Sequence, residues 1–272
     1  MICLEDVFYE YKNGYKALNN INLDIEKGEI VVVIGKNGSG KSTLGNVVSG
    51  IYNYSDGNIK LEGEIIKTKK GRSQLRGKIG IVFQNPDNQV IFNRVYDDMS
   101  FTLNNLGQDR KKIPHIIEES LKIVGMQDYI DRNPHELSLG QKQRIAIAEA
   151  ISINPLYMVF DEATSMLDAK GKKDIHKIVK ELSKKGIGII FITNIMEEIL
   201  LADKLLVIEK GSIVKKISKN EIIDNVEFLK KRGFDIPFIV NLILLLKRKG
   251  IDVNSFEEQD VLSILERVVK KL

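Results

Sequence analysis

The stretch GEIVVVIGKNGSGKST, residues 28 to 43, joins a continuous β-branched run to a glycine-rich loop. A run of this kind between glycines is typical of a strand buried on both faces, as strands of a parallel sheet are. Three similar runs follow later in the chain, in LYMVFDE, IGIIFIT and KLLVIEKG. Because helical stretches separate these runs, we expect an α/β fold with a mostly parallel, helix-covered sheet.

The loop itself, GKNGSGKST, matches the pattern G-x-x-x-x-G-K-[ST] and leads directly into a helical segment. Such a loop presents backbone N–H groups and a helix N-terminus to phosphate. Lys41 would reach the β- and γ-phosphates, and the Ser42 hydroxyl would ligate Mg²⁺. The sequence therefore predicts a nucleoside triphosphate site that includes Gly35, Asn37, Gly38, Ser39, Gly40, Lys41, Ser42 and Thr43.

Two acidic residues end the strand predicted in LYMVFDE. Alone, they would more often belong to a solvated loop or a helix cap. Together with a phosphate loop, they indicate catalysis: Asp161 would hold the Mg²⁺ shell and Glu162 would polarise the attacking water as a general base.

Composition limits the class of protein. Of the 272 residues, 43% are apolar and 29% are charged, as in an ordinary soluble protein. The apolar runs are too short to span a bilayer, no signal-like segment opens the chain, and the lone cysteine, Cys3, has no partner. We therefore expect a cytoplasmic protein. Its net charge of +4 comes from scattered basic residues, so no nucleic-acid partner is expected.

Three regions follow one another along the chain. Short β segments with glycine turns fill the first sixty residues. Helical periodicity with few strand signals predicts a helical subdomain at about 85–155, inside a main domain of residues 1–212. Residues 213–272 read as a helical extension, in which one helix would start at Pro237 and stop at Gly250.

The segment LSLGQKQRIAIAEAIS, residues 137–152, resembles the signature of ATP-binding cassette (ABC) ATPases, whose usual form is Leu-Ser-Gly-Gly-Gln. The phosphate loop, IVFQNPDNQ, the signature, the acidic strand end and SMLD occur in that family's order. FQNPDNQ and the tail also resemble the ATPase subunits of energy-coupling factor importers, which take up vitamins and transition-metal ions. The resemblance implies a P-loop NTPase fold: a RecA-like parallel core, an N-terminal antiparallel β subdomain, a helical subdomain and a small C-terminal helical extension.

The resemblance also implies roles for further residues. Gln84 would touch Mg²⁺ and the attacking water, and Tyr11 would stack on adenine, although a strand tyrosine is often only packed and a glutamine is often a surface amide. Two cassettes would meet head to tail, so that the signature of one chain closes on ATP bound to the other. The residues assigned to this contact are Ser138, Gly140, Gln141 and Asp168.

Two positions depart from the family pattern. Leu139 replaces the first glycine of the signature pair, and we expect the closing contact to survive this change. Asn194, in FITNIMEE, stands where the family carries a histidine that contacts the γ-phosphate. An amide can donate a hydrogen bond, but it cannot carry a positive charge, so turnover should fall more than ATP affinity. Asn194 could also cap the helix that follows.

The leading interpretation is an ATPase at the cytoplasmic face of the membrane, paired with a second, identical or related ATPase. The resemblance implies a transmembrane coupling subunit, docked near residues 84–100, and a separate substrate-binding membrane subunit; the tail would join the two ATPases. One alternative is a soluble cassette protein that acts on DNA or the ribosome, although the chain has one cassette and no long heptad run. Another is a non-hydrolytic nucleotide sensor, suggested by Asn194.

Overall fold

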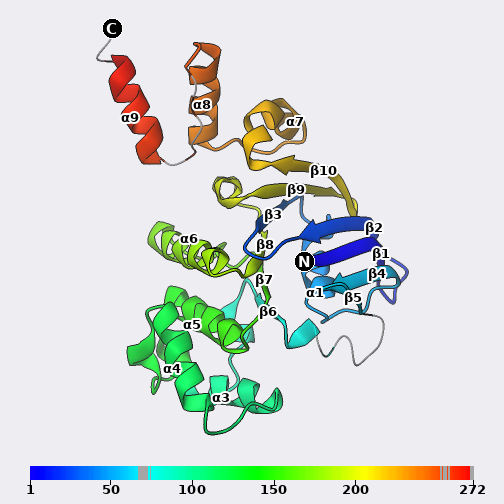
Figure 1. The fold of residues 1–272 in the computed structure, drawn as a ribbon, viewed down its shortest axis with the longest axis vertical. Coiled ribbons are helices and arrows are strands. Elements are labelled where there is room, and N and C mark those ends of the chain that lie inside the picture. The colour runs from blue at the N-terminus through cyan, green and yellow to red at the C-terminus, as the bar shows by residue number, and fades with distance from the viewer. Residues whose placement is uncertain (67–72, 74, 252, 254–255, 257, 270–272) are drawn as a thin grey trace.

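A six-stranded sheet with the order β10-β9-β3-β8-β7-β6 forms the centre of the fold (Figure 1). The computed structural model describes residues 1–66, 73, 75–251, 253, 256 and 258–269. The central strands are parallel, and the edge strand β10 is antiparallel to β9. The bounds are β3 (Ile30–Ile34), β6 (Ile79–Val82), β7 (Tyr157–Asp161), β8 (Gly188–Ile192), β9 (Lys204–Glu209) and β10 (Ser212–Ser218). The four runs predicted as buried strands are β3, β7, β8 and β9, so this prediction is confirmed.

Both faces of the central strands are covered, as the continuous apolar runs predict. In β3, Val31 and Val33 belong to one hydrophobic cluster and Val32 and Ile34 to another, because successive side chains point to opposite faces. The first cluster fills the space toward an antiparallel sheet with the order β2-β1-β4-β5, and it includes helix α1 (Lys41–Val48). Strands β1 (Ile2–Glu10), β2 (Lys16–Ile25), β4 (Asp56–Leu61) and β5 (Glu64–Ile65) form this second sheet.

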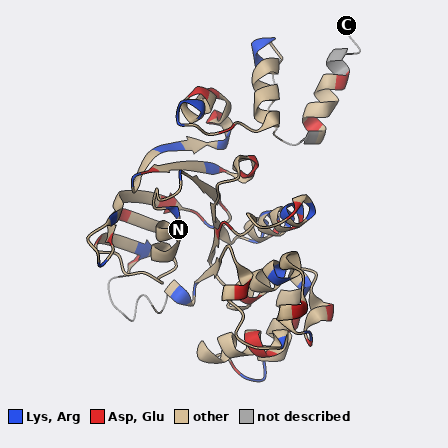
Figure 2. Cartoon of the chain, turned by 180° about the vertical axis from the view of Figure 1, so that it is seen from behind, with Lys and Arg blue, Asp and Glu red and all other residues tan. Residues whose placement is uncertain are grey.

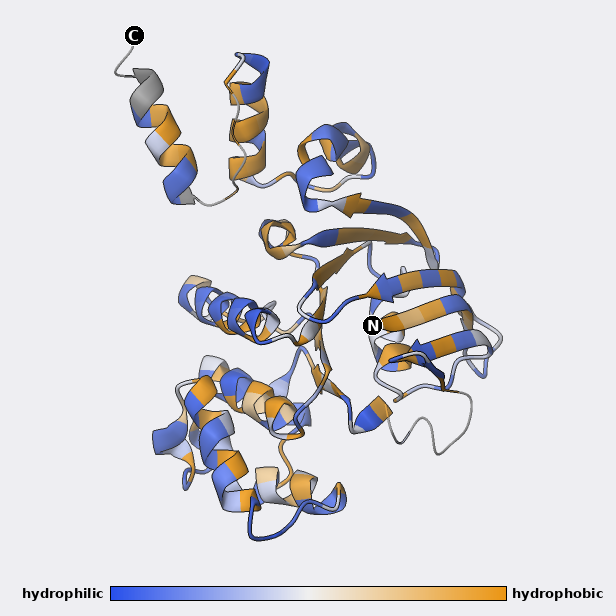
Figure 3. Ribbon diagram, viewed as in Figure 1, coloured by the Kyte–Doolittle hydropathy of each residue, from blue (hydrophilic) through white to orange (hydrophobic). Residues whose placement is uncertain are grey.

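The helices α3 to α6 belong to the second cluster, on the other face of the central sheet. Figure 3 shows apolar residues along their inner sides and along the central strands. Three of these helices lie in the segment where the sequence predicts a helical subdomain. The bounds are α3 (Val95–Asn105), α4 (Ile113–Ile123), α5 (Leu139–Ser152) and α6 (Ala169–Lys184). Acidic and basic residues are interspersed on most elements (Figure 2).

The C-terminal part begins within the sheet. The expected boundary after residue 212 falls just inside β10, and this strand pairs with β9 as an edge of the central sheet. Helix α7 (Val226–Lys231) adds buried Val226 and Leu229 to the main core. Helices α8 (Phe238–Arg248) and α9 (Glu258–Val269) lie farther out (Figure 1), yet Val240, Ile243, Leu246 and Val261 belong to the same cluster. Pro237 precedes α8 and Gly250 follows it with φ +76°, as the sequence predicts. Among the described helices, none has the length and apolar content that a bilayer span requires.

Candidate nucleotide-binding site

The glycine-rich loop connects the end of β3 to α1, and its shape depends on glycine at two positions. A Cβ atom at Gly35 would lie 2.4 Å from the carbonyl oxygen of Ile208. At Gly40, which has φ +106°, a Cβ atom would lie 2.5 Å from the carbonyl oxygen of Ala17. Side chains are therefore excluded where the loop passes neighbouring backbone.

Lys41 turns back into this loop. Its Nζ donates hydrogen bonds to the carbonyl oxygens of Gly35 (2.7 Å) and Lys36 (3.3 Å), and the residue is only 5% exposed. Burial lowers the pKa of Lys41, while the carboxylates of Glu162 and Asp161 act in the opposite direction. A buried ammonium held by two carbonyls can turn to an anion placed over the loop.

Asp161, at the tip of β7, accepts a hydrogen bond from the Ser42 hydroxyl over 2.9 Å. Burial raises the pKa of Asp161, and the Ser42 hydrogen bond opposes this shift. Two hard oxygen ligands side by side suit Mg²⁺, which keeps several waters and usually takes one or two protein oxygens together with phosphate. The described residues contain no cluster of three or more His, Cys, Asp or Glu side chains that could hold a metal.

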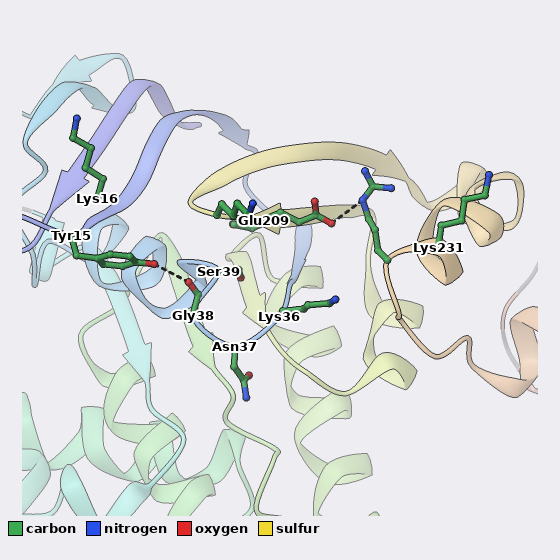
Figure 4. Close-up of a pocket in the computed structure, with 11 residues that line it drawn as sticks. Tyr15, Lys16, Lys36, Asn37, Gly38, Ser39, Glu209 and Lys231 are labelled. Carbon is green, nitrogen blue, oxygen red and sulfur yellow. Dashed lines mark hydrogen bonds and ion pairs between the residues drawn. The ribbon is translucent and has the colours of Figure 1, made fainter.

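A cavity of about 560 Å³ opens beside the loop (Figure 4). Its walls include Lys16, Lys36 and Lys231, which give it a basic lining, and the Tyr15 hydroxyl donates to the carbonyl oxygen of Gly38 over 3.2 Å. The Ser39 hydroxyl is buried in this wall and has no hydrogen-bond partner among the residues that the structure describes. Such a group is costly to leave unpaired, so the loop has the character of an incomplete anion site.

The acidic residue next to Asp161 contacts the predicted switch position. Asn194 Nδ2 donates to Oε1 of Glu162 over 2.5 Å and also lies 3.3 Å from Oδ1 of Asn37. Glu162 has φ +52°, a conformation that few non-glycine residues adopt. Asn37, Glu162 and Asn194 therefore meet beside the glycine-rich loop.

Asn194 does not cap the following helix, contrary to one alternative from the sequence. That helix is the short 3-10 helix η4 (Met196–Leu201), and its N-cap is Ile195, which makes no side-chain capping bond. The physical reason is position: η4 begins at Met196, so the N-cap position falls on Ile195 and Asn194 lies one residue before it, where its Nδ2 donates to Glu162 and Asn37. Capping alone thus cannot account for the asparagine.

Gln84 lies at the edge of this group of residues. Its Nε2 donates to the Ser165 hydroxyl over 3.1 Å, and that hydroxyl donates to the carbonyl oxygen of Glu162 over 2.9 Å. The amide is thus linked to the acidic strand end through Ser165, while Asp161 pairs with Ser42. Sequence reasoning did not single out Ser165, although it follows the acidic pair in the segment DEATSM.

Tyr11 lies behind the loop and is partly packed. Its hydroxyl is 3.0 Å from Oγ1 of Thr43, and its ring contacts those of Tyr9 and Tyr52 edge-on. The ring of Tyr15 is nearly parallel to that of Tyr11, with centroids 6.3 Å apart. Tyr15 was not among the predicted site residues, but it lines the cavity and Tyr11 does not.

The signature residues lie at a second site, separate from the glycine-rich loop. Ser138 is the N-cap of α5 and forms a capping box with Gln141, whose side chain also donates to the Tyr129 hydroxyl over 3.0 Å. Asp168 caps α6 by accepting a hydrogen bond from the Gly171 N–H over 2.7 Å. Ser138, Gly140 and Asp168 line a cavity of about 380 Å³ that shares no lining residue with the loop cavity. The structure therefore does not bring them to the loop.

A parallel sheet whose glycine-rich loop meets an acidic strand end defines a nucleotide-binding protein of the P-loop class. The family model described as ABC transporter matches residues 18–165. The energy-coupling factor transporter ATP-binding protein EcfA1 of Clostridioides difficile (strain 630) is 41% identical over 274 residues, covering 99% of this chain and 98% of that protein. The chain therefore belongs to the ABC transporter family of ATPases, in its energy-coupling factor branch.

Solved structures agree with this assignment. CbiO1 from Clostridium perfringens, part of the ABC transporter complex CbiONQ, superimposes with a TM-score of 0.75 at 34% identity, covering 89% of this chain and 97% of that one. The cassette MJ0796, in a dimeric post-hydrolysis state with ADP and Pi, gives a TM-score of 0.71 at 25% identity, covering 80% of this chain and 98% of that one. The P-loop fold predicted from the sequence is thus confirmed.

Proposed function

We propose that this chain is the ATP-binding and ATP-hydrolysing subunit of an energy-coupling factor importer for vitamins or transition-metal ions, and that it works at the cytoplasmic face of the membrane. One observation carries the proposal. The Ser42 hydroxyl and the Asp161 carboxylate lie 2.9 Å apart near the buried Lys41 ammonium. This closeness supports Ser42 and Asp161 as metal ligands and Lys41 as the phosphate-binding cation.

Each part of the loop has a task in this proposal. Backbone N–H groups from Asn37 to Thr43 and the α1 N-terminus bind the phosphates, and the unpartnered Ser39 hydroxyl gains an acceptor there. Lys41 moves from its carbonyl partners to the β- and γ-phosphates, and Tyr11 offers an aromatic face to adenine. Mg²⁺, held by Ser42, Asp161 and a reoriented Gln84, would neutralise charge on the phosphates.

Glu162 is the proposed general base. Its carboxylate accepts the proton of the attacking water, and the Asn194 amide holds this carboxylate in place. An amide has no exchangeable charge near neutral pH, so Asn194 can orient Glu162 but supplies no cation to the transition state. We therefore propose a slow site in this chain, with the partner's site faster. A non-hydrolytic nucleotide-sensing subunit is the second candidate, favoured by the same residue.

The signature cavity is the proposed contact with a second ATPase. Ser138 and Gly140 stand at the N-terminus of α5, where N–H groups favour an anion, and they line a cavity that shares no residue with the loop cavity. ATP on the partner chain would fill it, with Asp168 close by. Leu139 adds a side chain to this wall without closing the cavity.

A transmembrane coupling subunit would dock between the sheet and the helical subdomain. Ile91 is 67% exposed, and exposed Phe92 and Phe101 form a ring pair with centroids 5.3 Å apart. These apolar side chains follow Gln84, so a partner that moves them would also move the end of the nucleotide site. A separate substrate-binding membrane subunit would choose the cargo.

The extension is proposed to hold the two ATPases together. Phe238 (80%) and Leu245 (57%), both on α8, are exposed, which leaves apolar surface for a partner. Removal of residues 234–272 keeps α7 but takes away Val240, Ile243, Leu246 and Val261, which belong to the same buried cluster. We expect the truncated chain to have a lower Tm and to lose nucleotide-free pairing; pairing that persists in the folded truncated chain would contradict this role.

Purification of the transporter from native membranes, with mass-spectrometric identification of the bound subunits, tests the main proposal. We expect a second ATPase, a coupling subunit and a substrate-binding subunit, together with ATPase activity that the purified cargo stimulates. Recovery of ribosomal proteins or DNA in place of membrane subunits would contradict it. ATP binding without any turnover, in wild type and in Asn194→His, would favour the nucleotide-sensing candidate.

A further inference from the structure

Beneath the catalytic strand ends lies Glu198, a carboxylate with no exposed surface (0%). It stands in η4, just after the switch position. Burial of a carboxylate costs several kcal/mol unless charge-assisted hydrogen bonds replace water. Glu198 is therefore a residue for which the fold must supply several donors.

Three side chains provide these donors. The hydroxyl of Thr164 donates to Oε1 of Glu198, and the hydroxyl of Thr193 donates to Oε2. His176 on α6 approaches Oε1 with Nε2 at 2.8 Å. Both threonines are at most 1% exposed, so these bonds are shielded from water.

The two threonines that bind Glu198 lie close in the chain to Glu162 and Asn194. Thr164 comes two residues after Glu162, and Thr193 comes directly before Asn194. The Thr193 hydroxyl also accepts a hydrogen bond from the Ile195 N–H over 2.8 Å, so it fixes the backbone on both sides of Asn194. A single buried carboxylate thus binds the segments that follow β7 and β8.

The same two segments are also joined directly, by hydrogen bonds that do not involve Glu198. Asn194 Nδ2 donates to Glu162 Oε1 over 2.5 Å, and the Glu162 N–H donates to the carbonyl oxygen of Ile192 over 2.9 Å. Contacts therefore run in a ring from Glu162 through Thr164, Glu198 and Thr193 to Asn194 and back. A shift of Glu198 would change the separation of the general base and the switch residue.

We propose that Glu198 is a positioning residue for ATP hydrolysis. Through Thr164 and Thr193 it sets the geometry of Glu162 and Asn194, with His176 fixing the carboxylate from α6. The inference rests on the proposed function, because it assumes that Glu162 acts on the attacking water. Misplacement of a catalytic group by about 1 Å costs on the order of a hundredfold in rate, so a small change beneath the site should act on kcat.

The variants Thr193→Val, Thr164→Val and Glu198→Gln, each introduced into the full-length chain and measured in the assembled complex, test this inference. Four quantities are measured: Tm, ATP affinity, kcat with KM, and retention of ADP–aluminium fluoride as a mimic of the transition state. We expect kcat and retention to fall at least about tenfold while KM and ATP affinity change less than about twofold, the pattern of a lost transition-state interaction.

Ser183→Ala is the matched control. Ser183 is on α6, as His176 is, and its hydroxyl donates to the carbonyl oxygen of Gly28 over 2.7 Å without touching either catalytic strand end. We expect this variant to lower Tm and leave kcat and KM unchanged. Valine is close to threonine in shape, so the threonine variants should fold even if Glu198→Gln does not.

Two results would overturn the inference in distinguishable ways. Threonine variants that keep wild-type kcat and retention, measured well below their Tm, would show that Glu198 only stabilises the fold. A wild-type complex in which this chain binds ATP but neither turns it over nor retains the mimic would overturn the proposed hydrolysis, and the positioning role with it. The double variant Thr193→Val, Asn194→Ala tests whether Thr193 acts through Asn194. We expect Thr193→Val to lower kcat less in the Asn194→Ala background than in wild type, and full additivity of the two effects would contradict action through Asn194.

Discussion

The side-chain amide of Asn194 donates a hydrogen bond to Oε1 of Glu162 over 2.5 Å. This contact keeps the carboxylate beside the phosphate loop in the absence of a histidine. It also uses the amide N–H group that, in the proposed function, would face a γ-phosphate oxygen. In that proposal this contact orders the site, but residue 194 supplies no positive charge.

Asn194→His should raise kcat. An imidazole at this position can donate a hydrogen bond and become protonated, so it can stabilise charge that develops on the γ-phosphate. We expect an increase of at least about tenfold in kcat with KM changed less than about twofold, measured by steady-state phosphate release from the assembled complex. If turnover is unchanged in this variant and Glu162→Gln abolishes it, the site was competent with asparagine.

Lys41→Ala should weaken ATP binding without a comparable loss of stability. Within the described part of the chain, the ammonium donates only to the carbonyl oxygens of Gly35 and Lys36, and its pKa is lowered by burial, so its removal costs the empty protein little. We expect the Kd for ATP to rise by at least about tenfold, as befits a charged hydrogen bond of about 1.5–3 kcal/mol, with Tm nearly constant. Lys36→Ala, an exposed neighbour in the same loop, is the comparison; an equal effect of both variants would speak against a special role for Lys41.

Gly40→Ala should destabilise the loop itself. The new Cβ atom would approach the carbonyl oxygen of Ala17 to 2.5 Å, at a φ of +106° that alanine rarely adopts. We expect a loss of about 2 kcal/mol or more, seen as a lower Tm. Gly63→Ala separates the two causes, because Gly63 also has positive φ (+86°) but no atom within 4 Å of its added Cβ. Equal losses would exclude a steric cause.

Glu149→Gln should stabilise the protein at alkaline pH and leave it unchanged in acid. Burial raises the pKa of Glu149 from 4.5 to about 7, although its hydroxyl partner Thr102 opposes the shift. The folded state thus binds more protons than the unfolded state between these values, and the stability from this group is lost as pH rises through 7. Glutamine avoids that loss.

The measurement is Tm at pH 5 and at pH 8. The Tm shifts are converted to free energies of unfolding. We expect the stability advantage of Glu149→Gln over wild type to be about 1–3 kcal/mol larger at pH 8 than at pH 5. Glu118→Gln, at an exposed position on the adjacent helix α4, should show no such change. A pH-independent effect of Glu149→Gln would mean that the carboxyl is not the titrating group.

The central strands and the phosphate loop could be predicted because local sequence determines them. A continuous β-branched run such as Ile30–Ile34 has no polar face, and the glycine pattern after it encodes a loop conformation. The helix between Pro237 and Gly250 was equally clear from its start and stop residues. In these elements, the residues that decide the structure are close together in the chain.

Contacts between residues that are far apart in the chain could not be predicted from local sequence. Glu198 looks like an exposed acidic residue at a helix start, and its burial depends on Thr164 and His176 from other elements. The η4 helix was expected to be an ordinary helix with Asn194 as a possible cap, but it begins one residue later, with Ile195 as its N-cap. The Asn194 amide instead donates to Glu162, 32 residues away. Tyr15 lay in a crowded aromatic segment, from which its place over Gly38 could not be read.

The separation of the loop cavity from the signature cavity has a genetic consequence. In a head-to-tail pair of two copies, a chain with Lys41→Ala keeps its signature, and a chain with a defective Ser138 keeps its loop, because the two cavities share no lining residue. Neither mutant paired with itself would contain an intact nucleotide site. Mixed pairs would regenerate one, so two inactive alleles expressed together should restore part of the activity if like chains pair.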